Sequence, residues 1–122
     1  MAALKSPDAL VRYWAAVAAL TAKTLPDLKP LLTDKEIVVR LAAAEAILQR
    51  GDNAGARAVV EAGLQAKLPE ARLFAINVAA RLPGELPPAW RPILQRLDDV
   101  KSRNGPEDYV IRAAMDLMEA KP

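Results

Sequence analysis

The sequence predicts an all-α protein built from repeated helical hairpins, and three observations lead to this class. First, 52% of the 122 residues are hydrophobic but only 4% are aromatic. Together with the many alanines, this composition is typical of helices that pack at close range. Second, apolar and polar residues do not alternate over any useful length, so a β-sheet is not expected. Third, similar apolar segments recur along the chain, which is long enough for one domain with a modest core.

Proline, glycine and capping residues place the helices of the first half. Met1–Lys5 looks like the last turn of a helix, and the Ser-Pro-Asp break after it predicts a first full helix over about 8–22. Two prolines bound or bend a short helix over 26–32. Asp34 is expected to accept hydrogen bonds from the free amides at the start of the next helix, which runs to about Arg50 and ends at a glycine.

Similar residues mark the starts and ends of the helices in the second half. Asn53 is expected to cap a helix, Pro69 to begin another, and the Leu-Pro-Gly sequence after Arg81 to stop it. A polar loop precedes the last helix, which a Pro-Glu-Asp sequence opens. The expected helices cover about 54–66, 69–81, 88–97 and 106–120, with the polar loop over 98–106.

Four of these helices share one pattern, an apolar residue followed by arginine. The arginines are 28, 32 and 40 residues apart (40−12, 72−40, 112−72), and two Pro-rich short segments, LPDLKPLL and PPAWRPIL, recur as well. Three arginines are followed three positions later by alanine, where neighbouring helices are expected to approach most closely. Such a period predicts stacked helical hairpins, an α-solenoid. The repeated positions are Arg12, Arg40, Arg72 and Arg112 for arginine, and Ala15, Ala43 and Ala75 for alanine.

This pattern resembles the HEAT-like repeat family, in which a short outer helix and an Asp-containing turn precede Val-Arg and an Ala-rich inner helix. The resemblance covers nearly the whole chain and implies one domain, 1–122, of about three and a half hairpins. In the family, the Asp before the inner helix and the Arg within it form a polar ladder between repeats. Here the matching acid is present only at Asp34, which predicts an incomplete ladder. The repeats implied are roughly 1–22 (truncated), 23–51, 52–84 and 85–122.

A narrower resemblance rests on SPDALVRYWAAVAAL, followed by VRLAAAEAIL and RLFAINVAARL. These segments are similar to the HEAT-like segment that lies C-terminal to the catalytic domain in some bacterial sulfatases. The sulfatase nucleophile motif, Cys/Ser-x-Pro-x-Arg, is absent from the chain, so the resemblance implies only an accessory role. A sulfatase parent would place the protein outside the cytoplasm, exported or periplasmic.

The composition argues against catalysis by this segment. The chain contains no histidine and no cysteine, which removes imidazole acid–base chemistry, thiol nucleophiles and zinc sites of the His or Cys type. No Gly-rich turn presents a serine or threonine as a nucleophile. The acids beside the polar loop lack the spacing of a calcium-binding EF-hand. We therefore expect no enzyme activity, no metal and no cofactor.

The charge distribution indicates whether the chain binds nucleic acid, and the hydropathy indicates whether it enters a membrane. Seventeen basic and fifteen acidic residues give a net charge of +2, and their interleaving predicts a solvated surface rather than a basic stripe. The start of the chain does not read as a signal peptide, and no apolar run approaches the ~20 residues that span a bilayer, so a soluble chain is expected. A nucleic-acid-binding HEAT-like domain is the alternative function. Glu45 and Asn77 argue against it, because a basic inner face would carry Lys or Arg there.

The aromatic start of the first helix is the predicted interaction surface. Only Met1–Lys5 is available to cover that helix, so Tyr13, Trp14 and Val17 are expected to lie exposed, as in a fragment of a larger protein. The expected partner is a protein: the parent's catalytic domain, another protein or a second copy. The four arginines could also form an anion ladder, but bonds to turn carboxylates and carbonyls between repeats are favoured. The two tryptophans could form a stacking site, but helix packing or a protein contact is favoured. The inner-face residues expected to contribute are Tyr13, Val17, Glu45 and Asn77.

Overall fold

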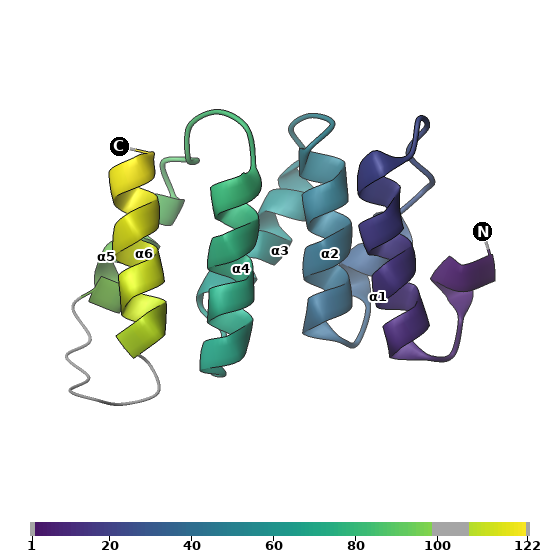
Figure 1. Cartoon of the computed structure of the whole chain (residues 1–122), viewed down its shortest axis with the longest axis horizontal. Helices are drawn as coiled ribbons and strands as arrows, with labels where there is room; N and C mark the ends of the chain where they lie inside the picture. Colours follow the sequence, from purple (N-terminus) through teal and green to yellow (C-terminus); the bar gives the residue numbers. More distant parts are fainter. Residues whose placement is uncertain (1, 99–107, 122) are drawn as a thin grey trace. The chain divides into compact units, whose positions relative to one another are not determined.

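The computed structural model describes residues 2–98 and 108–121, and the regular structure in these ranges is entirely helical (Figure 1). The all-α prediction is therefore confirmed for the described residues, which contain six α-helices, three 3₁₀ helices and no strand. The predicted polar loop over 98–106 lies almost wholly outside them. The α-helices are α1 (Ala9–Ala18), α2 (Ile37–Leu48), α3 (Ala54–Leu64), α4 (Pro69–Arg81), α5 (Trp90–Asp98) and α6 (Asp108–Ala120); the 3₁₀ helices are η1 (Ala2–Lys5), η2 (Ala19–Thr21) and η3 (Lys29–Thr33).

The predicted helix boundaries are closest where proline and glycine mark them. Helix α4 has the predicted bounds, because Pro69 supplies its first turn and the chain turns extended at Leu82. The helix expected over 26–32 is instead the 3₁₀ helix η3, in which Pro30 lacks the amide that a longer α-helical ladder would use. Helix α2 begins at Ile37 rather than directly after Asp34, because Glu36, which precedes it, has an extended backbone.

The chain divides into two compact units, Met1–Val60 and Glu61–Pro122, with the boundary inside α3. In the first unit α1 lies beside α2 and also contacts η1, while η3 packs on α2 (Figure 1). Small residues allow the two long helices to approach closely, and each leucine buried between them and η3 contributes roughly 1.5–3 kcal/mol. The core residues are Ala16, Ala19, Leu28, Leu31, Val39, Ala42, Ala43 and Ala46.

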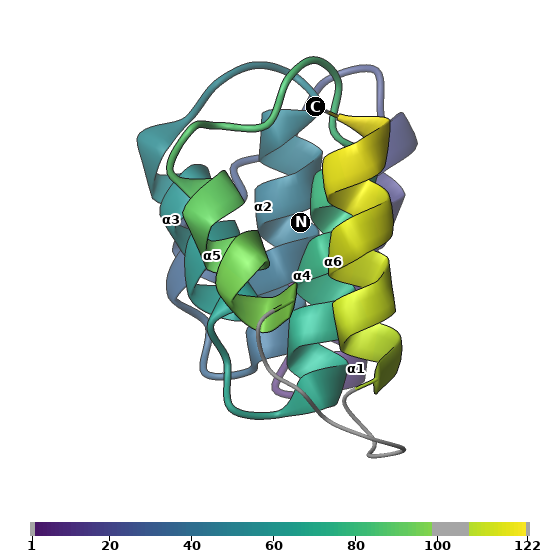
Figure 2. The ribbon, with the colours of Figure 1, turned by 90° about the vertical axis from the view of Figure 1, so that its left-hand side faces the viewer.

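In the second unit α6 contacts both α4 and α5 (Figure 2). Trp90 and Leu94 of α5 are fully buried, as are Val110, Ala114 and Leu117 on α6. The side chain of Trp90 is the largest that is fully buried among the described residues. It is therefore a packing residue, as favoured from the sequence. Within the described ranges, no helix combines the length and the apolar character needed to cross a membrane.

Candidate interaction surface and the contacts that position it

One arginine hydrogen bond recurs in three helices. In each case guanidinium Nη1 donates to the backbone carbonyl oxygen of the residue six positions earlier, just before the helix begins. The bond ties the first turn of the helix to the loop that leads into it, where carbonyl groups would otherwise lack partners. Position 106, the equivalent acceptor for Arg112, lies outside the described residues. The three bonds are Arg12 to Ser6 (2.8 Å), Arg40 to Asp34 (2.6 Å) and Arg72 to Ala66 (3.2 Å).

Arg12 also forms a two-pronged ion pair with the carboxylate of Asp34, which precedes the next long helix. Nε lies 2.8 Å from Oδ2, and Nη2 lies 3.2 Å from Oδ1. Both side chains are largely shielded from solvent. The hydrogen bond from Arg12 lowers the pKa of Asp34, although burial opposes the shift, and the same bond raises the pKa of Arg12. This pair is one rung of the type expected for a polar ladder between repeats.

Asp34 itself has a different capping role from the one predicted. Its Oδ1 accepts from the backbone N–H of Glu36 at 2.9 Å, and Glu36 is the residue that precedes α2. Asp34 therefore orders the turn before the helix rather than capping the first helical turn. The side chain of Asn53, in contrast, accepts from Ala56 N at 2.9 Å and caps α3 as predicted.

A cation also closes the opposite end of the α1–α2 pair. Arg50, which follows α2, donates from Nη2 to the carbonyl oxygens of Ala19 (3.1 Å) and Ala22. These carbonyls lie at the C-terminal end of α1 and η2, where the helix dipole is negative. The sequence placed Arg50 beside the end of its own helix. The structure shows that it instead binds the end of the preceding one.

Lys121 plays the corresponding part in the second unit. Its Nζ, just after α6, donates to the carbonyl oxygens of Leu82 and Gly84, which follow α4. Arg91 of α5 in turn donates to the carbonyl oxygen of Lys121 at 2.5 Å. In both units, therefore, a cation after one long helix binds the carbonyl groups at the end of the preceding long helix.

The exposed face of α1 and η2 carries no charge. Every exposed residue of these two elements is apolar or a threonine. Leu10 and Trp14, one turn apart, are 62% and 58% exposed, and Val11 is 41% exposed. A helix that is apolar around its whole circumference normally lies buried. We call this set the α1 outer surface: Leu10, Val11, Trp14, Ala18 and Thr21.

The repeat register shows what this surface corresponds to. Moving 28 residues along the chain takes Val11, Trp14 and Ala18 to positions 39, 42 and 46 of α2. Those three positions are buried in the core that α2 shares with α1. Val11, Trp14 and Ala18 of the α1 outer surface therefore occupy positions whose counterparts on α2 are buried.

Trp14 is the most exposed of the three predicted interaction residues on α1. Its ring meets that of Tyr13 edge-on, with the centroids 5.2 Å apart and the planes at 76°. Tyr13 and Val17, however, are half-buried and pack against the core of the first unit, because the α1 face that carries them turns inward. Leu10, Val11 and Ala18 were not among the interaction residues predicted from the sequence, although these uncharged residues lie three or four positions from Trp14 along the helix.

The residues five positions after the arginines differ in exposure. Asn77 on α4 is exposed, but Glu45 on α2 is only 5% exposed, so Glu45 does not lie on an exposed face of its helix. The reason is that α2 is covered around most of its circumference, with eight of its twelve residues buried. The three alanines expected at close helix contacts, Ala15, Ala43 and Ala75, are all buried.

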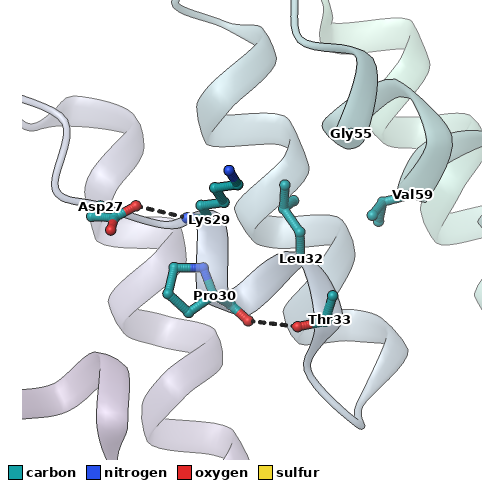
Figure 3. A pocket seen from close by; sticks show the side chains of 7 residues that line it. All are labelled: Asp27, Lys29, Pro30, Leu32, Thr33, Gly55 and Val59. Atoms are coloured by element: carbon teal, nitrogen blue, oxygen red, sulfur yellow. Dashed lines mark hydrogen bonds between the residues drawn. The ribbon is translucent and has the colours of Figure 1, made fainter.

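A shallow hollow of about 600 Å³ lies between η3 and the start of α3 (Figure 3). Its wall is mainly apolar, and its polar groups take part in local turns. Asp27 Oδ1 accepts from Lys29 N at 3.2 Å, and Thr33 Oγ1 donates to Pro30 O at 3.2 Å. The lining could hold a small apolar group but brings no acid and base together. It consists of Asp27, Lys29, Pro30, Leu32, Thr33, Gly55 and Val59.

Among residues 2–98 and 108–121, no three potential metal ligands cluster together. The chain matches none of the family models, curated proteins or solved structures with which it was compared.

Proposed function

We propose that this chain is a non-catalytic helical-repeat scaffold, an α-solenoid of about three and a half HEAT-like hairpins, that binds another protein through the α1 outer surface. The observation that carries the proposal is the exposure of Val11 and Trp14, whose counterparts 28 residues later, Val39 and Ala42, are buried in the core of the first unit. A surface of this kind loses water favourably when a protein covers it, and tryptophan is enriched among residues that dominate interface energies.

The arginine contacts support the repeat part of the proposal. The same bond to a carbonyl six residues earlier holds the start of α1, α2 and α4. Cations after α2 and α6 bind the carbonyls that end α1 and α4. Repeated contacts at both ends of the long helices are expected if each hairpin is a copy of one structural unit. The resemblance to sulfatase-associated segments makes a hydrolase catalytic domain one class of partner to test.

The proposal is tested by comparing proteins retained by three tagged forms of the full chain. The forms are the unaltered protein, Trp14→Glu on the α1 outer surface and Met115→Glu on α6. Met115 is a matched control because it is also an exposed apolar residue on a helix, at 49% exposure. We expect a protein retained by the unaltered chain and by Met115→Glu but lost from Trp14→Glu. Identical sets from all three forms would contradict the proposal.

A further inference from the structure

We propose that the α1 outer surface is covered by the same surface of a second copy of this chain, with the two α1 helices antiparallel about a two-fold axis. This inference rests on the proposed function, because it names the partner of the surface assigned there. Four features of the first unit carry it: the absence of charge, the size of Trp14, the position of a small residue opposite it, and the charges at the two ends of the surface.

The absence of charged residues from the exposed face of α1 indicates that another surface normally covers this face. The last helix, α6, provides the comparison within the same chain. Its exposed residues include Arg112, Asp116 and Glu119 beside Tyr109 and Met115, which is the mixed surface expected of a helix that faces solvent. The exposed face of α1 has none. Two such faces can meet without burying a charge or bringing like charges together.

The size of Trp14 excludes a covering helix that packs on this face in the way that α1 packs on α2. On α2 the equivalent position is Ala42, which is only 4% exposed and packs closely on α1, running in the same direction (Figure 1). A parallel helix packed against α1 in the same way would collide with the indole ring of Trp14, because Ala42 presents only a methyl group at the equivalent position of α2. The covering helix must therefore cross differently and present a small residue opposite Trp14.

An antiparallel second copy meets this requirement. If the axis passes beside the helix at the level of Ala16, Trp14 of each copy lies over Ala18 of the other. The same axis brings Leu10 of one copy within about one residue of Thr21 of the second copy. Large side chains then meet small ones on both halves of the interface, as an isologous contact requires.

The charges that flank the surface fit the same axis. Asp8 lies just before α1 and Lys23 just after η2, and both are exposed. The axis that pairs Trp14 with Ala18 also brings Asp8 of one copy within about one residue of Lys23 of the other, twice per dimer. A parallel arrangement would instead place Asp8 beside Asp8 and Lys23 beside Lys23. Charge complementarity therefore favours the antiparallel orientation.

The expected dimer is weak. One face of a three-turn helix buries less than the roughly 1,200–2,000 Å² of a standard stable interface, so we expect a dissociation constant on the order of 10–100 µM. Sedimentation equilibrium of the full chain over a range from about 5 µM to 1 mM should show the mass rising from 13.2 kDa toward twice that value. Trp14→Glu should weaken association at least tenfold, whereas Met115→Glu should leave it unchanged.

Cross-linking tests the orientation. The chain contains no cysteine, so Leu10→Cys and Thr21→Cys each introduce a single thiol at an exposed position. With a short bis-maleimide, a mixture of the two variants should give more cross-linked dimer than either variant alone. Faster cross-linking of each variant with itself would overturn the antiparallel arrangement.

The outcomes separate this inference from the proposed function. A constant mass of 13.2 kDa at every concentration would overturn the second copy as partner. If the capture experiment then still shows a protein that depends on Trp14, the proposed function stands and the partner is a different chain. If it shows none, both proposals are wrong.

Discussion

Arg12 binds the carboxylate of Asp34 with two guanidinium nitrogens, 2.8 and 3.2 Å from the carboxylate oxygens, and its third nitrogen holds the carbonyl oxygen of Ser6. One side chain therefore joins the turn before α1 to the turn before α2. The pair fixes the two long helices of the first unit at the end where both begin. The α1 outer surface lies on the helix whose start this contact holds.

Asp34→Asn should destabilise the first unit, because the amide cannot replace the charge that Arg12 binds. We expect the midpoint of thermal unfolding to fall by on the order of 5 °C. Circular dichroism at 222 nm measures this midpoint. Asp27→Asn is the control, since Asp27 is an exposed acid that only accepts a hydrogen bond within its own turn.

The same pair predicts an acid-sensitive component of stability. The pKa of Asp34 is lowered in the folded protein, so its contribution is fully present above the ordinary aspartate value of about 3.9. The contribution declines as the pH falls below that value toward the folded pKa, because the unfolded chain binds the proton first. Urea unfolding from pH 6 to pH 2.5 should show this loss in the unaltered protein. In Asp34→Asn the loss should be smaller, and equal losses in both proteins would contradict the assignment.

Arg50→Met should loosen the other end of the α1–α2 pair. The methionine keeps an apolar stem but cannot donate to the carbonyl oxygens of Ala19 and Ala22. We expect a loss of about 1 kcal/mol in the free energy of unfolding. Lys67→Met, which removes an exposed charge outside the first unit, should cost much less. A similar loss from both substitutions would mean that the carbonyl contacts do not contribute.

Ala43→Leu should overfill the core between α1 and α2. Ala43 is fully buried in that core, and three extra carbons there cost about 1–3 kcal/mol. The midpoint of chemical denaturation measures the effect. Ala80→Leu on α4 provides an exposed alanine for comparison and should be nearly neutral. An unchanged midpoint for Ala43→Leu would disprove the close approach.

Trp90→Phe should leave the protein folded and make Trp14 its single tryptophan. Trp90 is fully buried, and its indole N–H has no acceptor among the described residues. The substitution therefore loses some packing but also removes an unpaired polar group, so we expect a net change within about 2 kcal/mol. Acrylamide should then quench the remaining fluorescence strongly in dilute solution. Weak quenching there would show that Trp14 is not exposed.

The sequence predicts the helices better than their contacts. Proline and glycine act on neighbouring residues, so the bounds of α4 follow from Pro69 and the Leu-Pro-Gly sequence alone. Ala15, Ala43 and Ala75, which the sequence marks by their constant spacing from the arginines, are all buried. The contact of Lys121 with Leu82 and Gly84 joins groups far apart in the chain. No local pattern indicates such a contact.

The exposed residues of α1 were predicted only in part for a related reason. Trp14 is conspicuous as an aromatic residue in an alanine-rich helix, but exposure depends on how α1 is rotated against α2. That rotation exposes Leu10 and turns Tyr13 and Val17 toward the core. Glu45 is the opposite case. A single acidic residue in an apolar helix is expected to be exposed to solvent, yet the side chain of Glu45 is buried.

The measurement that tests the central claim most directly is photo-cross-linking in the protein's own cell, with benzoylphenylalanine introduced at position 14 and, as the control, at position 115. If the α1 outer surface binds a protein, position 14 should give defined covalent adducts that position 115 does not. An adduct of twice the chain mass would identify a second copy. If position 14 gives no adduct beyond those formed from position 115, the α1 outer surface is not an interaction surface and the account is wrong.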